Sequence, residues 1–118
     1  MSIAELLDAM ENELGSEPHV MKLLSKLDEK AVFEHAANKN FAMSGQNIPM
    51  KYKLLINIAV SAALSEENCA EIYTRVARRK GVSVEEIMEA ILLARFVKAT
   101  NVFNTSTKAM EFLLEDKY

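Results

Sequence analysis

The residues of this chain best suited to chemistry lie in one short segment, SEENCAEIYTRVARRKG, residues 65 to 81. The segment holds the only cysteine, Cys69, with Glu66 before it and Tyr73 after it. On a helix that turns by about 100° per residue, Glu66 and Tyr73 project within roughly 20° of each other, and Cys69 lies about 60° away on the same side. The spacing therefore groups a carboxylate, a thiol and a phenol, which are groups that carry nucleophilic or acid–base catalysis.

The local sequence exerts opposing influences on the Cys69 thiol. A place near a helix N-terminus favours the thiolate, whereas the carboxylate of Glu66, when ionised, disfavours a second negative charge beside it. Arg75 lies on the other side of the helix, and neither His19 nor His35 is near in sequence. We expect a thiol that its own helix does not strongly activate, unless the fold or another subunit brings a base. The alternative is a small buried apolar side chain.

The other polar candidates have structural explanations. The basic run from Arg75 to Lys80 would complement a helix C-terminus, and no interleaved aromatic residues support a nucleic-acid surface. His19 and His35 lack metal-ligand spacing to each other or to Cys69. We therefore expect solvated or capping histidines, no metal site and no bound cofactor.

Length and composition indicate a soluble, intracellular chain folded as one domain over residues 1–118. Half of the residues are hydrophobic, and 14 basic against 17 acidic residues give a net charge of −3, which makes no electrostatic case for nucleic acid. One cysteine excludes an intrachain disulfide and fits a reducing compartment, so we expect the cytoplasm. The N-terminus lacks the basic start of a signal peptide, and the longest apolar stretch, residues 54–64, is too short to span a bilayer.

In the first half of the chain, periodic apolar residues and a few punctuating residues predict helices. Gly15 is expected to end the first helix, Pro18 to lie in the first turn of a short second one, and Asp28 to cap the third. Residues 44–49 form the clearest loop.

In the second half, Ser65 is expected to cap the helix that carries the thiol, and Gly81 to end it. Ser83 begins a capping-box pattern before an aliphatic helix, and a last helix is expected to carry Val102, Phe103 and residues 110–114. No strand alternation of useful length occurs. The fold class is therefore predicted to be all-α, with six or seven helices.

The helix expected over residues 50–64 is apolar on nearly every side. Such a helix is buried on most of its surface, so in a chain this short it is either central or covered by another subunit. Asn57 and Ser61 lie four apart on it and need hydrogen-bond partners. They could bond across an interface or point into a pocket.

A longer run, KYKLLINIAVSAALSEENCAEIYTRVARRKGVSVEEIMEAILLA, residues 51 to 94, resembles the core repeat of the carboxymuconolactone decarboxylase family, which includes the alkylhydroperoxidase D-like proteins. The matching features are the Lys-Leu-Leu-Ile helix start, the small-residue helix, the thiol helix with Arg75, and the aliphatic helix opened by Glu85 and Glu86. The resemblance implies an all-α fold, a core motif over residues 51–94, and self-association, commonly into trimers or hexamers.

The peroxidase branch of that family resembles Cys-x-x-Cys-x-x-x-His, with a glutamate in the preceding helix completing a proton relay. On this chain the first cysteine falls on Glu66, the second on Cys69, the histidine on Tyr73 and the relay glutamate on Leu54. The resemblance implies, at most, a peroxiredoxin-type antioxidant activity in which Cys69 alone reduces hydroperoxides. An external thiol would then have to resolve the oxidised cysteine.

Two other interpretations stay open. In the decarboxylase branch, Glu66 could act as a carboxylate and Tyr73 as a weak acid or hydrogen-bond donor toward a small carboxylated or lactone substrate. In the other, the protein is a non-catalytic oligomeric binding protein that kept the fold and lost the site. Glu66 would then be a first-turn glutamate favoured by the helix dipole, and Tyr73 a locally packed ring. The candidate catalytic residues are thus Cys69, Glu66 and Tyr73.

Overall fold

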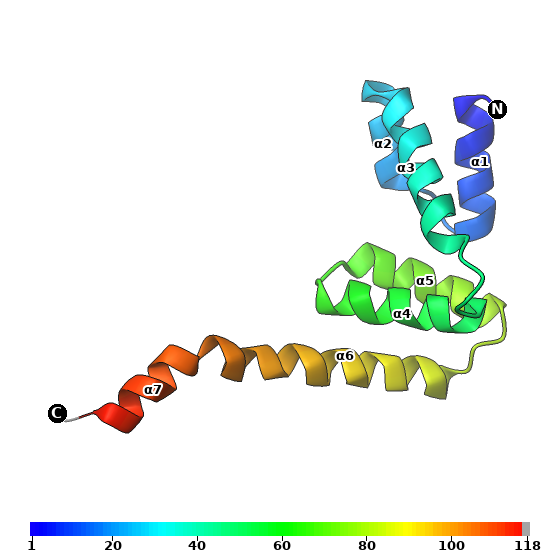
Figure 1. The fold of residues 1–118 in the computed structure, drawn as a ribbon. Helices are drawn as coiled ribbons and strands as arrows, with labels where there is room; N and C mark the ends of the chain where they lie inside the picture. Colours follow the sequence, from blue (N-terminus) through cyan, green and yellow to red (C-terminus); the bar gives the residue numbers. More distant parts are fainter. Residues whose placement is uncertain (117–118) are drawn as a thin grey trace.

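The fold is built from helices joined by short connections (Figure 1), and the computed structural model describes residues 1–116 of the 118. Within this part of the chain there are seven helices and no strand, so the all-α prediction is confirmed. The helices are α1 (Ile3–Leu14), α2 (His19–Leu27), α3 (Glu29–Met43), α4 (Met50–Ala63), α5 (Glu67–Arg79), α6 (Val84–Thr105) and α7 (Thr107–Glu115).

The helices form two groups and a projection (Figure 1). The first group contains α1, α2 and α3, and α1 reaches across to α5. In the second group α4 packs against both α5 and the first half of α6. Residues 95–115, the second half of α6 together with α7, run away from both groups, and we call them the arm. The two termini therefore lie at opposite ends of an elongated molecule measuring 68 × 36 × 25 Å.

Most of the predicted helix boundaries are confirmed. Gly15 ends α1 in the left-handed region with φ 73°, and Gly81 follows α5 with φ 84°. Asp28 caps α3, its Oδ1 accepting from the Ala31 amide at 3.2 Å. The Ser83 hydroxyl accepts from the Glu86 amide at 3.1 Å while the Glu86 carboxylate accepts from the Ser83 amide at 3.0 Å, which completes the capping box. These interactions span three residues or fewer, which is why the sequence reveals them.

The prediction that Ser65 caps the thiol helix is wrong. Ser65 has φ 60° and lies in the tight turn that leaves α4. Glu66 occupies the N-cap position without a side-chain cap bond, so it is not a first-turn residue either. The Ser65 hydroxyl instead accepts from Lys98 Nζ at 3.3 Å, which ties this turn to α6.

The boundary of the last helix also differs from the prediction. Val102 and Phe103 belong to α6, which continues to Thr105 before α7 begins. Between Val84 and Thr105 the sequence has no glycine or proline to stop the helix. The Ser106 amide donates to the Phe103 carbonyl at 3.0 Å, which marks the bend between the two helices.

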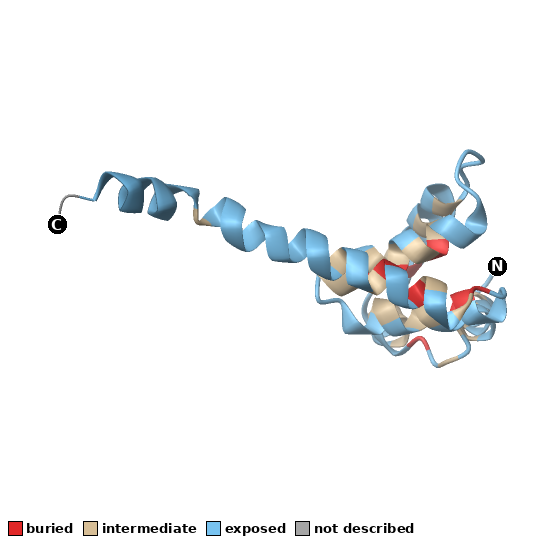
Figure 2. Ribbon diagram, turned by 90° about the horizontal axis from the view of Figure 1, so that it is seen from below, coloured by how far each residue is buried: buried red, intermediate tan, exposed pale blue. Residues whose placement is uncertain are grey.

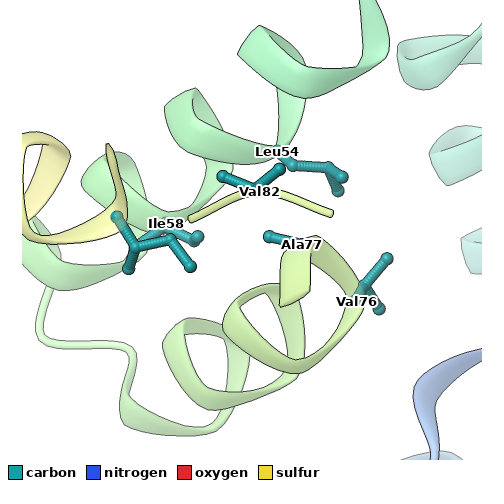
Figure 3. Packing of buried hydrophobic residues seen from close by; sticks show 6 residues of the cluster. Leu54, Ile58, Val76, Ala77 and Val82 are labelled. Atoms are coloured by element: carbon teal, nitrogen blue, oxygen red, sulfur yellow. The ribbon is translucent and has the colours of Figure 1, made fainter. Parts of the chain in front are cut away.

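The main core lies where α4, α5 and the start of α6 meet (Figure 3). Leu54 and Ile58 of α4 are each only 1% exposed and face Ala77 of α5 and Val82 of the following turn. Full burial of side chains of this size stabilises the fold by about 1.5–3 kcal/mol each. Buried residues gather in this region and thin out along the arm (Figure 2).

Only one side of α4 is buried by its own chain, and covering of its other side by another subunit stays an expectation. Leu54, Ile58 and Ser61 form the buried side, whereas Ile56 and Val60, on the opposite side, are 46% and 51% exposed. The Asn57 side-chain amide donates to the Met43 sulfur at 3.4 Å, so it has a partner within the chain. No helix in the described part of the chain is long and apolar enough to cross a membrane.

Candidate functional site

The first turns of α5 form one wall of a cavity of about 270 Å³. The facing walls come from the end of α1, the turn after it, the start of α2 and one side of α3. No residue of α4, α6 or α7 lines it. The lining residues are Met10, Leu14, Glu17, Pro18, His19, Val20, Met21, His35, Lys39, Glu66, Asn68, Cys69, Ile72 and Tyr73.

The three candidate catalytic residues share this cavity, as their helical spacing predicts. Cys69 is half-buried, Tyr73 projects one turn further along α5, and Glu66 lies at the exposed start of the helix. The thiol is therefore neither sealed in the core nor free on the surface. A small molecule entering the cavity from solvent would meet the thiol with the phenol beside it.

The surroundings of Cys69 favour the neutral thiol. Burial raises the pKa of the Cys69 thiol, and the Glu66 carboxylate raises this pKa further. The position of Cys69 near the N-terminus of α5 favours a lower thiol pKa, but the two effects that raise this pKa are larger. The expectation that the helix itself does not strongly activate Cys69 therefore agrees with the structure.

Tyr73 is also held in its neutral form. Burial raises the pKa of the Tyr73 phenol, and the negative charges that Cys69 and Glu13 carry when ionised raise this pKa further. A neutral phenol can donate one hydrogen bond and accept others. Tyr73 is thus suited to orient a polar group or the thiol, but it is a poor base at neutral pH.

His19 and His35 are both exposed, which agrees with the expectation of solvated histidines. Neither caps a helix through its side chain: His19 opens α2, and His35 lies in the middle of α3. Both line the cavity across from α5, in the same space as Cys69. The cavity thus brings together segments more than 30 residues apart, because α2 and α3 pack on α1, which contacts α5.

On α3, a positive charge accompanies His35. Lys39 lies one turn after His35 and also lines the cavity, and its Nζ is 3.0 Å from the Glu13 carboxylate. The i, i+4 spacing of His35 and Lys39 was visible in the sequence, but nothing in it connected that face to Cys69. Among the described residues, no group of three or more His, Cys, Asp or Glu side chains is arranged to hold a metal ion.

Arg79, at the far end of α5, fixes α1 against the site helix. Its Nη1 donates to the carbonyls of Asn12 at 3.3 Å and Glu13 at 3.1 Å. These are among the carbonyls that a helix C-terminus leaves without partners. Gly15 permits this approach, because a Cβ built there would lie 1.7 Å from Arg79 Nη2. Part of the basic run thus holds the cavity wall in place.

The remaining relay position of the family pattern is occupied by a core residue. Leu54 is fully buried in the α4–α5–α6 core and contributes no polar atom. The cavity therefore offers one thiol, with histidines on the facing wall instead of on the thiol's own helix. The described part of the chain is thus all-helical and has a half-buried thiol in the wall of a cavity.

The model of the carboxymuconolactone decarboxylase family matches residues 18–112, and the chain belongs to this family. Its fold is the all-α, alkylhydroperoxidase D-like one that the resemblance implied. The matched range includes His19, His35 and every site residue of α5, but not α1. A comparison with curated proteins gave no match.

Proposed function

We propose that the cavity is the site of a thiol-dependent hydroperoxide reductase that uses Cys69 as its only redox-active side chain. The observation that carries the proposal is the cavity itself, which exposes the thiol to small molecules and faces it with two histidines. A volume of about 270 Å³ suits a small substrate. The proposed chemistry fits the cytoplasm, because a lone thiol and a thiol reductant both belong in a reducing compartment.

In the first step the Cys69 proton passes to a base, and the thiolate attacks the distal oxygen of a hydroperoxide. The O–O bond breaks, a sulfenic acid forms on Cys69, and the alkoxide leaves with a proton as the alcohol. Sulfur is oxidised and the peroxide is reduced by two electrons. His35 or His19 is the proposed base and then the acid, since histidine is the side chain best suited to exchange protons near neutral pH.

In the second step an external thiol must regenerate the enzyme. Glu66 stands where a dithiol site would have its partner cysteine, so no internal disulfide can form. One molecule of a small thiol attacks the sulfenic acid and releases water, leaving a mixed disulfide on Cys69. A second molecule attacks that disulfide, releases the Cys69 thiol and leaves as the oxidised disulfide of the reductant.

The test is hydroperoxide consumption in the presence of a small-molecule thiol, comparing the wild type with Cys69→Ala. Loss of the protein-dependent rate in Cys69→Ala is expected, and equal rates in the two proteins would end the proposal. His35→Gln and His19→Gln are expected to lower the wild-type rate, the larger loss identifying the base. Lys26→Gln, on an exposed part of α2 outside the cavity, is the matched control and is expected to have no effect.

A second candidate is a decarboxylase-like enzyme acting on a small carboxylated or lactone substrate. It is favoured by the raised pKa of the Cys69 thiol, which argues against strong nucleophilic activation, and by the presence of Glu66 and Tyr73 in the same cavity. Lys39 and the histidines could hold the carboxylate of such a substrate. Turnover of a small lactone or β-keto acid by Cys69→Ala, with loss in Tyr73→Phe and Glu66→Gln, would favour it over the reductase. Inactivity in both assays would favour the third interpretation, a non-catalytic binding protein.

A further inference from the structure

A second cavity, of about 140 Å³, adjoins the one that Cys69 lines. We call the larger one the thiol cavity and the smaller one the side chamber. Leu14, Lys39 and Tyr73 line both, so the two spaces meet at these side chains. Four residues of helix, a rise of about 6 Å, separate Tyr73 from Cys69. A small molecule with its reactive end at the thiol can therefore place its other end in the side chamber.

The side chamber has an apolar inner wall and a polar outer end. Leu54 and Val76 belong to the main core and form part of the inner wall (Figure 3). Asn40 and Lys80 are exposed, so they lie where the chamber opens to solvent. A ligand group in this chamber would thus lie against core side chains and meet polar groups at its outer end.

The charged side chains of the side chamber do not balance. Lys39 Nζ lies 3.0 Å from the Glu13 carboxylate, so these two charges offset each other. Lys80 makes no side-chain hydrogen bond or ion pair with any residue that the structure describes. Because a lysine ammonium can donate hydrogen bonds but cannot accept them, the chamber has one positive charge and its donors to spare.

The neutral groups add to the surplus of donors. The Tyr73 hydroxyl has no hydrogen-bond partner within the described residues and is free to donate to a ligand. Hydrogen bonds from ammonium groups to carboxylates are among the strong ones. A water molecule occupies about 30 Å³ of liquid, so the chamber admits a group of about four or five non-hydrogen atoms. A carboxylate with one or two methylene groups meets both the charge and the size.

The thiol reductant gains more from such an anchor than the hydroperoxide does. The Glu66 carboxylate in the thiol cavity repels an incoming thiolate, whereas an uncharged hydroperoxide needs no compensating attraction. The mixed disulfide of the proposed function also holds the reductant's chain at Cys69, beside Tyr73. The lysines of the side chamber lie where the far end of that chain would reach.

We propose that the side chamber binds the carboxylate of a small aliphatic thiol, so that anionic thiols are the preferred reductants of Cys69. Lys39 and Lys80 determine this specificity, and Glu13 weakens it through its own negative charge. The role as a reductant site rests on the proposed function, whereas the preference for a carboxylate can be measured without peroxide.

The test is disulfide exchange of the full-length protein with the symmetric disulfide of mercaptobutanoic acid and, separately, with its neutral diamide. The Cys69 thiolate attacks one sulfur, the S–S bond breaks, a mixed disulfide forms on Cys69 and the other half leaves as a thiolate. Intact mass gives both rates, and their ratio cancels the reactivity of Cys69 itself. The wild type is expected to prefer the acid, and Lys80→Gln to lower the ratio about fivefold.

Glu13→Gln provides a gain that loss of folding cannot imitate. It removes the negative charge from the side chamber and releases Lys39, so the ratio of the acid rate to the diamide rate is expected to rise about fivefold. Asp8→Asn makes the same change of charge on α1 outside both cavities, and Lys30→Gln matches Lys80→Gln on an exposed part of α3. Both controls are expected to keep the wild-type ratio.

The same thiols, used as reductants in the peroxide assay, separate this proposal from the proposed function. A preference for the acid in disulfide exchange, without any peroxide consumption, would support the side chamber and end the reductase. Equal ratios in the wild type, Lys80→Gln and Glu13→Gln would overturn the side chamber, whether or not peroxide is consumed. A preference for carboxylated hydroperoxides, with none among thiols, would overturn it in favour of a substrate subsite.

Discussion

The centre of the molecule and its arm are both helical and both rich in apolar residues, yet only the centre is complete by itself. In the centre, α4, α5 and the start of α6 bury Leu54, Ile58 and Ala77 almost fully. In the arm, side chains of the same kind face solvent (Figure 2). Helical spacing produces an apolar face in either region, but a fold forms only where something covers that face. The Cys69 cavity lies between α5 of the centre and the N-terminal helices, and no residue of the arm lines it.

The largest difference between the two regions should appear in the free energy of unfolding. Ile58→Ala is expected to destabilise the protein by about 2–5 kcal/mol, because it empties a fully buried position. Phe103→Ala removes more atoms but should change the stability of the dissociated protein by no more than about 0.5 kcal/mol. Denaturant unfolding at low protein concentration measures both. Similar losses in the two variants would erase the distinction between centre and arm.

The junction between the N-terminal helices and the centre is tested at Gly15. Gly15→Ala should cost about 1–3 kcal/mol, because alanine is strained at φ 73° and its Cβ would displace the Arg79 guanidinium. Gly81→Ala, at φ 84° but in open space, should cost only the strain of about 1–2 kcal/mol. Gly45→Ala meets nothing within 4 Å and is the control, expected to be neutral. Thermal unfolding of the three variants measures these losses of stability. The prediction would be contradicted if Gly15→Ala were the least destabilised of the three.

The site itself is probed through the pH dependence of thiol reactivity. Because Glu66 adds to the raised pKa of the Cys69 thiol, Glu66→Gln should lower this pKa and move the alkylation profile to lower pH. Burial is the larger cause, so the profile should remain above that of a free thiol. Alkylation rates across the pH range measure this effect, with Glu67→Gln as the matched control. A shift to higher pH in Glu66→Gln would contradict the electrostatic account.

A smaller effect is expected where α4 and α6 are joined at the surface by the ion pair of Lys51 and Glu86. The hydrogen bond from Lys51 is the main reason that the pKa of the Glu86 carboxyl is lowered from 4.5 to about 2. Because the folded-state pKa is the lower one, the stabilisation is present above pH 4.5 and is lost as the pH falls toward about 2. Melting temperatures should fall more steeply across this window in the wild type than in Glu86→Gln. Parallel curves would contradict the prediction.

The smallest expected effect is that of the arm on the site. Phe103→Glu should keep the wild-type rate of peroxide consumption per protomer, because no residue of α6 or α7 lines the cavity. The assay is the one used for Cys69→Ala, run at equal protomer concentration. A large loss in Phe103→Glu but not in Asn101→Glu, which adds the same charge at another position of the arm, would show that the centre and the arm are functionally coupled.

The local features of this fold could be predicted from the sequence, and the long-range ones could not. The caps at Gly15, Asp28 and Ser83 depend on neighbours within four residues, and the shared face of Glu66, Cys69 and Tyr73 depends only on helical periodicity. The N-cap prediction for Ser65 is wrong because serine is a preferred N-cap residue, and its residue type does not reveal the left-handed turn that it forms after α4.

The histidines across the cavity were missed for a different reason. His19 and His35 line the same cavity as Cys69 only because α2 and α3 pack on α1 and α1 contacts α5, which periodicity within each helix does not specify. Which side of α6 is left exposed could not be predicted from the sequence for the same reason. Its aliphatic composition predicts a helix but not which of its two apolar sides the chain itself will cover.

The most direct measurement for the proposed site is the mass of intact protein after reaction with one equivalent of hydroperoxide in the absence of a reductant. The account predicts the addition of one oxygen atom at Cys69, trapped by a sulfenic-acid reagent and reversed when a small-molecule thiol is added. Cys69→Ala should gain nothing at this site. An unmodified Cys69, with oxidation confined to surface methionines, would contradict a peroxide-reducing thiol in this cavity.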